Sequence, residues 1–200
     1  NLGNLLKSLG KLEEAELSFR KAIKIKPDYA EAHSNLGNIL RDLGNLQDAE
    51  LSTRKAIELK PDYAMAHSNL GNILRDLDKL QDAELSTRKA IELNPNYAKA
   101  HCNLGSILID LGKLKDAELS YRKAIQLEPD FANAHSNLGL ILKDLGKLKE
   151  AELSTRKATE LNPNLAEGHL NLGNILVDLG KLEEAELSIR KAIQLKPNYA

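Results

Sequence analysis

Apolar residues recur at helical spacing in two successive runs between residues 30 and 59. The stripe of the first predicted helix consists of Ala32, Leu36, Ile39, Leu40 and Leu43. The stripe of the second, which we expect from about Gln47 to Leu59, consists of Leu46, Ala49, Thr53, Ala56 and Ile57. Gly44 separates the two runs, and glycine takes the left-handed conformation at a helix end most easily. So short a turn predicts that the two helices are antiparallel neighbours.

The residues that flank these runs predict how the helices begin and end. Asp28 precedes the first helix and has capping-box spacing with Glu31, so we expect Asp28 to be its N-cap. Pro61 stops the second helix. Asp78 stands where Gly44 would recur, and it tolerates the left-handed conformation less well, at a cost of about 1 kcal/mol.

This helix pair is one unit of a 34-residue repeat that fills the chain. The prolines keep its register, since all of them stand one period apart: Pro27, Pro61, Pro95, Pro129, Pro163 and Pro197. Full repeats span 30–63, 64–97, 98–131, 132–165 and 166–199, after a partial repeat at 1–29. A fixed period of this length indicates a stack of like units. We therefore expect residues 1–200 to form a single all-α array.

A further glycine lies inside each predicted first helix, where it costs about 1 kcal/mol relative to alanine. The set is Gly3, Gly37, Gly71, Gly105, Gly139 and Gly173. We expect the backbone of the second helix, near Ala49, to press against Gly37. Phosphate binding is not indicated, because the chain has no GxGxxG or P-loop pattern.

Leu36-Gly37, Ala49, Ala56 and Pro61, with equivalents in every repeat, resemble the tetratricopeptide repeat (TPR) over the whole chain. His33 and Leu40 depart from the family's large aromatic and tyrosine, which affects core volume. The resemblance implies a right-handed superhelix, an α-solenoid, whose first helices line a concave groove that holds peptides or proteins. The chain is most similar to long bacterial TPR arrays and to the TPR arm of O-linked N-acetylglucosamine transferase.

Asparagines form two columns on the polar face of the first helices. The first column is Asn1, Asn35, Asn69, Asn103, Asn137 and Asn171; the second is Asn4, Asn38, Asn72 and Asn174. Ser106 and Leu140 interrupt the second column, and Arg41 and Arg75 flank it. An amide donates and accepts hydrogen bonds as a peptide unit does. With helices about 8–10 Å apart and an extended peptide advancing about 3.3 Å per residue, one asparagine could engage every third peptide unit.

The transferase arm carries a similar asparagine ladder, so the resemblance implies a peptide-binding role for the first column. Two alternatives stay open: the asparagines bridge neighbouring first helices, or they were simply copied when the repeat was duplicated.

Two other columns are expected to be structural. The histidines are His33, His67, His101, His135 and His169. Neighbours one repeat apart are too distant to share a zinc ion with bonds of about 2.0–2.1 Å, so we expect packing and no metal. The aspartates are Asp42, Asp76, Asp110, Asp144 and Asp178. We expect them to be solvated or paired with adjacent basic residues such as Arg41, and not to serve as acid–base catalysts. No catalytic constellation or cofactor site is expected.

Composition narrows the function classes further. The net charge of −1 does not indicate the excess of positive charge that binding to nucleic acid or to a membrane surface usually requires. No apolar run approaches the roughly 20 residues that span a bilayer. Cys102 is the only cysteine, which excludes an internal disulfide and favours a reducing, cytoplasmic compartment. Because Asn1 stands in mid-pattern, we expect a segment upstream.

The sequence therefore predicts an interaction scaffold, not an enzyme, whose partner is a protein or peptide in extended conformation. One alternative is the substrate-recruiting arm of a larger, glycosyltransferase-like protein whose catalytic domain is absent; another is a self-assembling structural array. Because the repeats are nearly identical, the two ends are complementary, and we expect end-to-end self-stacking. The apolar residues expected to be exposed there are Leu2, Leu5, Leu6, Leu9, Leu187, Ile189, Ile193, Leu195 and Tyr199.

Overall fold

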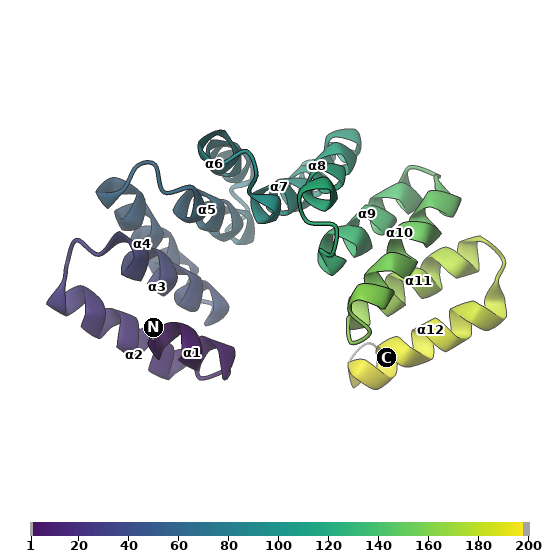
Figure 1. Ribbon diagram of the computed structural model, residues 1–200, viewed down its shortest axis with the longest axis horizontal. Helices are drawn as coiled ribbons and strands as arrows, with labels where there is room; N and C mark the ends of the chain where they lie inside the picture. Colours follow the sequence, from purple (N-terminus) through teal and green to yellow (C-terminus); the bar gives the residue numbers. More distant parts are fainter. Residues whose placement is uncertain (1, 198–200) are drawn as a thin grey trace. The chain divides into compact units, whose positions relative to one another are not determined.

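The computed structural model describes residues 2–197, which form twelve α-helices and no strand (Figure 1). The first helices of the repeats are α1 (Leu2–Ser8), α3 (Ala30–Asp42), α5 (Ala64–Asp76), α7 (Ala98–Asp110), α9 (Ala132–Asp144) and α11 (Ala166–Asp178). The second helices are α2 (Leu12–Ile25), α4 (Leu46–Leu59), α6 (Leu80–Leu93), α8 (Leu114–Leu127), α10 (Leu148–Leu161) and α12 (Leu182–Leu195). The chain divides into two compact units, residues 1–103 and 104–200. The predicted all-α class of paired helices is confirmed.

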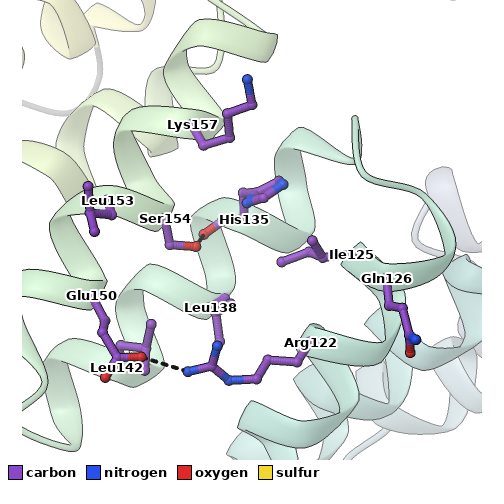
Figure 2. A pocket seen from close by; sticks show the side chains of 10 residues that line it. All are labelled: Arg122, Ile125, Gln126, His135, Leu138, Leu142, Glu150, Leu153, Ser154 and Lys157. Atoms are coloured by element: carbon purple, nitrogen blue, oxygen red, sulfur yellow. Dashed lines mark hydrogen bonds and ion pairs between the residues drawn. The ribbon is translucent and has the colours of Figure 1, made fainter.

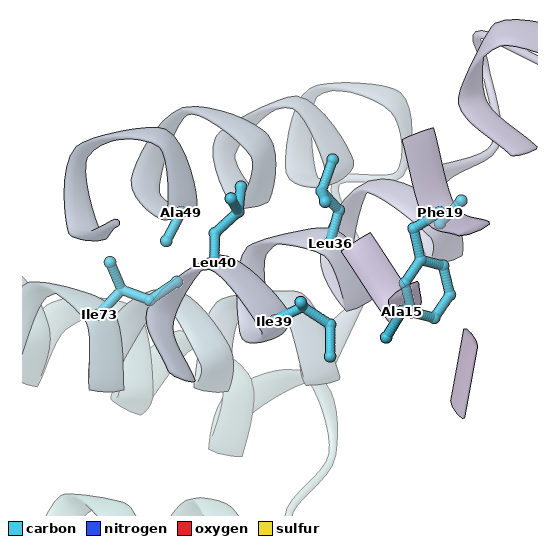
Figure 3. Close-up of a cluster of buried hydrophobic side chains, with 8 residues drawn as sticks. Ala15, Phe19, Leu36, Ile39, Leu40, Ala49 and Ile73 are labelled. Atoms are coloured by element: carbon cyan, nitrogen blue, oxygen red, sulfur yellow. The ribbon is translucent and has the colours of Figure 1, made fainter. Parts of the chain in front are cut away.

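Within each unit, a first helix packs against three neighbours. Helix α3 contacts α4 of its own repeat, α2 of the preceding repeat and α5 of the following repeat. Figure 3 shows the resulting cluster, in which Leu36, Ile39 and Leu40 of α3 lie between Phe19 of α2 and Ile73 of α5. Helix α9 likewise contacts α10, α8 and α11. Each repeat thus buries its apolar stripe both between its own two helices and against its neighbours, as in other repeat proteins.

The helix ends agree with the sequence at the C-terminal turns but not at the N-caps. Gly44 has a φ of 81°, and Asp78, with a φ of 59°, takes the same left-handed conformation. The predicted N-cap at Asp28 is wrong: Tyr29 occupies that position, and no side chain caps α3. The Tyr29 N–H donates to the Lys26 carbonyl at 3.2 Å, so Asp28 lies inside this turn, one residue too early to cap the helix.

The glycine inside each first helix is required by a side chain of the second helix. A Cβ atom on Gly37 would lie 2.0 Å from Oγ1 of Thr53 and 3.1 Å from the Ala49 carbonyl oxygen. The expected steric role is therefore confirmed, but the nearest obstacle is Thr53, not the backbone near Ala49. The ring of Tyr121 fills the same space at Gly105.

Carboxylates of the second helices accept hydrogen bonds from lysines of the following repeat. Lys79 Nζ donates to Glu50 at 2.7 Å, and this bond holds the pKa of Glu50 below its ordinary value, although burial acts in the opposite direction. In the same way Lys147 lowers the pKa of Glu118. Lys181 does so for Glu152.

We expect the free energy of unfolding to fall as the pH drops below about 5. These folded-state pKa values lie below the ordinary value of 4.5, so the contribution to stability is present above that value. It is lost as the pH falls through the folded-state pKa. Urea unfolding between pH 7 and pH 3 measures this. A Lys79→Met variant should be less stable than the wild type by about 0.2–1 kcal/mol at pH 7. That deficit should shrink at pH 3, and an equal deficit at both pH values would contradict the assignment.

Most of the apolar residues named for the two ends are accessible. Leu2, Leu5, Leu9, Leu187 and Ile193 are exposed. Leu6, Ile189 and Leu195 are half-buried, and Tyr199 lies outside the described residues. End-to-end stacking itself stays a prediction. None of the described helices combines the length and hydropathy that crossing a membrane requires.

Candidate functional site

The first asparagine column forms hydrogen bonds between successive first helices. Asn69 Nδ2 of α5 donates to Ser34 Oγ of α3 at 3.0 Å, and Asn103 Nδ2 donates to Ser68 Oγ at 3.0 Å. Within residues 104–200, Asn171 Nδ2 donates to Ser136 Oγ at 3.1 Å. The serines are almost fully buried, whereas the asparagines are half-buried. The alternative that these asparagines bridge neighbouring first helices is therefore confirmed for Asn69, Asn103 and Asn171, and peptide binding stays a prediction.

The other candidate residues lie on the same face of their helices. Asn35, Asn137, Asn38 and Asn72 are half-buried and Asn174 is exposed. We call the two columns together the asparagine face. Arg41 and Arg75 lie in the last turns of α3 and α5, and both are half-buried.

The aspartate column pairs with cations, but across repeats. Arg41 Nε donates to Oδ2 of Asp76, in the next repeat, at 2.5 Å. Asp42, the sequence neighbour of Arg41, pairs with Lys7 of the preceding repeat at 2.8 Å. Lys143 and Asp178 form the same pair at 3.4 Å in the second unit. Arg41 therefore links two repeats at the edge of the asparagine face, as well as being a candidate to contact a ligand.

An aromatic column beside the asparagine face went unnoticed in the sequence. Tyr63 lies within hydrogen-bonding distance of Ser34, the serine that Asn69 also binds, and Tyr97 has the same relation to Ser68. Burial raises the pKa of Tyr63, the nearby Glu31 carboxylate adds to this, and the Ser34 hydrogen bond acts against it. The sequence does contain a signal for this column, because the last residue of each repeat, two positions after the proline, is aromatic in all repeats but one. These residues are Tyr29, Tyr63, Tyr97, Phe131, Leu165 and Tyr199.

The tyrosines also carry a cation close to their rings. Lys60 Nζ lies 5.1 Å from the ring centroid of Tyr63, and Lys26 Nζ lies 5.7 Å from that of Tyr29. Lys60 also forms an ion pair, because its Nζ lies 3.6 Å from a carboxylate oxygen of Glu31. Two phenol rings of the aromatic column in the first unit, those of Tyr29 and Tyr63, are therefore each flanked by a lysine.

Each histidine joins its first helix to the turn that precedes it. The Nε2 atom of His33 lies 2.9 Å from the Pro27 carbonyl oxygen, and all five histidines make the same contact with the proline six residues earlier. A carbonyl oxygen only accepts, so Nε2 carries the proton. The structural role is confirmed, although it includes a hydrogen bond as well as packing. Among residues 2–197, no cluster of three or more His, Cys, Asp and Glu side chains could hold a metal ion.

Family models for this repeat match along the chain. One, described as tetratricopeptide repeat, matches residues 30–63, 64–97, 132–165 and 166–199, which is more than half of the chain. The chain belongs to the tetratricopeptide repeat family. A second tetratricopeptide repeat model matches residues 87–118, and a TPR repeat model matches residues 3–44 and 105–146. The comparison with curated proteins gave no match.

Solved TPR structures resemble this chain over most of its length. YrrB, described as a TPR protein with an unusual peptide-binding site, is 27% identical; the match covers 90% of this chain and 92% of YrrB, with a TM-score of 0.64. TTC0263, a thermophilic TPR protein of Thermus thermophilus, is 26% identical over 88% of this chain and 96% of its own, with a TM-score of 0.78. The APC/C hetero-tetramer Cut9–Hcn1 is 18% identical, which shows the fold alone; the match covers 98% of this chain and 39% of the other, with a TM-score of 0.91.

Proposed function

We propose that this TPR chain is a non-catalytic interaction module that binds an extended peptide segment along its asparagine face. The observation that carries the proposal is the hydrogen bond from Asn69 to Ser34, repeated from Asn103 to Ser68. This bond uses one N–H of each amide and fixes the direction of the rest. Each side chain keeps a second N–H donor and its Oδ1 acceptor, the pair of groups that a peptide unit requires.

Fixing these amides before the ligand arrives reduces the entropy that binding must lose. The hydrogen bond to serine uses only part of each amide, so one asparagine can bridge two helices and bind a peptide at the same time. Because the repeat spacing is about three residues of an extended peptide, consecutive asparagines would meet every third peptide unit.

Side-chain selectivity needs groups that differ between repeats. The second residue of each full first helix does differ: it is Glu31, Met65 or Lys99 in the first unit. Tyr63 Oη lies 3.6 Å from Met65 Sδ, so this variable position adjoins the aromatic column. We infer that the asparagines hold the backbone of the peptide, while the variable column and the tyrosines read its side chains.

Similarity to YrrB supports the peptide class of ligand, since YrrB is described as having a peptide-binding site and matches 90% of this chain. The transferase-arm alternative uses the same face within a larger protein. It stays a prediction, as does the self-assembling array.

The test uses a peptide selected from a random linear library on the immobilised chain. Its backbone nitrogens are then methylated one at a time, which removes a hydrogen-bond donor and leaves the side chains unchanged. We expect affinity to drop about 2- to 12-fold at every third position, as the loss of one hydrogen bond of about 0.5–1.5 kcal/mol implies. Failure to select any peptide, or losses without this period, would contradict the proposal.

A further inference from the structure

A second surface lies between successive second helices and contains no residue of the asparagine columns. In the first unit it is a groove of about 500 Å³ between α2 and α4, floored by α3. In the second unit a groove of about 540 Å³ lies between α8 and α10, floored by α9. We call each an outer groove. Figure 2 shows the second one, with Arg122 and Ile125 of α8 facing Glu150 and Leu153 of α10.

The two outer grooves are lined by the same ten positions, three repeats apart. Leu36 and Leu40 form the buried floor of the first, as Leu138 and Leu142 do in the second. A surface that recurs in two separately packed units is a property of the repeat and not an accident of one site.

The wall of each groove carries a leucine that the fold leaves exposed. Leu51 is 67% exposed and Leu153 is 71% exposed. The same position is an exposed leucine in every second helix: Leu17, Leu51, Leu85, Leu119, Leu153 and Leu187. Two residues further on, the inward-facing position varies among Phe19, Thr53, Tyr121 and Ile189. Among the repeats, the core position therefore varies while the exposed position is always leucine. Helix propensity does not explain this, because glutamine and lysine have a helix propensity similar to that of leucine.

The charge of the groove selects the occupant. The first groove has three cationic side chains and one carboxylate on its rim: Arg20, Lys24, Lys55 and Asp48. Arg20 and Lys55 bind glutamates of their own helices, whereas neither Lys24 on one wall nor Asp48 on the other has an ion-pair partner among the described residues. In the second groove Gln126 takes the place of Lys24, and Arg122 Nη2 reaches across to Glu150 at 2.8 Å. The first groove is therefore the more positive of the two.

The walls also constrain the backbone of an occupant. They are helices, whose own hydrogen bonds are satisfied internally, so they offer side chains but no row of backbone donors or acceptors. A segment that satisfies its own backbone fits such a site, and an amphipathic helix does so while presenting apolar anchors at i, i+3, i+4 and i+7. We propose that the outer groove of residues 20–55 docks an acidic amphipathic helix of a partner protein, with its apolar face on Ile23 and Leu51 of the walls and its carboxylates on Lys24.

The probe is a designed peptide of about 18 residues that forms a helix with leucines on one face and glutamates beside them. Its control has lysines in place of the glutamates. We expect fluorescence anisotropy with the full chain to show at least tenfold tighter binding of the acidic probe. Leu51→Gln should weaken that binding about tenfold, whereas Gln47→Ala, an exposed change on the same helix outside the groove, should leave it unchanged. Lys24→Glu should reverse the preference between the two peptides.

Several outcomes would overturn the proposal. Equal affinity for both peptides would mean unspecific apolar contact, and equal behaviour of Leu51→Gln and Gln47→Ala would place the probe elsewhere. If the acidic peptide did not bind at all, the outer groove would not be a docking site for such a helix. Light scattering that shows a dimer, lost in Leu51→Gln, would make a second copy of this chain the occupant instead. Circular dichroism establishes that each variant remains folded, which is expected because the substituted side chains are accessible.

Discussion

Gly105→Leu is expected to lower the free energy of unfolding by about 1–3 kcal/mol or more, because it overpacks the contact between α7 and α8. A Cβ atom at this position would lie 2.8 Å from the Tyr121 ring, even before the rest of the leucine is added. The ring has little freedom to retreat: Tyr121 is fully buried, and its hydroxyl lies 2.9 Å from Ser106 Oγ. Replacing a mid-helix glycine by itself stabilises the helix by about 1 kcal/mol, so the variant is less stable only if the overpacking cost is larger than this gain.

Gly168→Ala is the matched control for this experiment. It replaces a buried glycine of α11 by the alanine that other full repeats have there, at Ala32, Ala66, Ala100 and Ala134. Its Cβ would lie 3.1 Å from Leu165 Cδ2, the end of a flexible side chain. We expect urea unfolding to show a gain of up to about 1 kcal/mol for this variant. If Gly105→Leu were as stable as the wild type, the glycine would be tolerated and not required.

The period and the apolar stripes predicted the helix pairs because both signals are local. Gly44 took the expected left-handed conformation, and Asp78 takes it too, because the short turn between the two helices requires a positive φ at this position. Asp28 did not become an N-cap, because its role depended on where a turn closes, and a shift of one residue decides that. Thr53 was placed on the inner stripe, but its contact with Gly37 depends on how the two helices cross, which no spacing along the chain specifies.

The candidate site was predicted less completely, for a related reason. A repeat shows which residues are equivalent but not which neighbour each one faces. Asn69 could be assigned to a column, yet its bond to Ser34 of the preceding repeat appears only when two repeats are stacked. The pairing of Arg41 with Asp76 in place of Asp42 has the same origin. Leu51 drew no attention because an exposed leucine is ordinary by itself, and only the column and its groove make it informative.

The largest effect on binding is expected from the double variant Asn69→Ala plus Asn103→Ala. Two amide contacts with a peptide, each contributing about 0.5–1.5 kcal/mol, correspond to a loss of affinity of about 5- to 150-fold. The measurement is a titration with a library-selected peptide, followed by fluorescence anisotropy. The same substitutions remove two hydrogen bonds between first helices, so a loss of affinity alone does not distinguish recognition from destabilised packing.

The double variant Ser34→Ala plus Ser68→Ala separates the two roles. It removes the same two hydrogen bonds from the other side, together with those of Ser34 and Ser68 to Tyr63 and Tyr97, but it keeps both amides on the asparagine face. We expect the serine variant to lose at least as much stability as the asparagine variant in urea unfolding, while only the asparagine variant loses most of its affinity for the peptide. The serine variant should bind only slightly more weakly than the wild type, because its amides are present but less well oriented. Equal losses of affinity in the two variants would mean that the asparagines act on binding only by holding the helices together, and peptide recognition would then have to be assigned to other side chains.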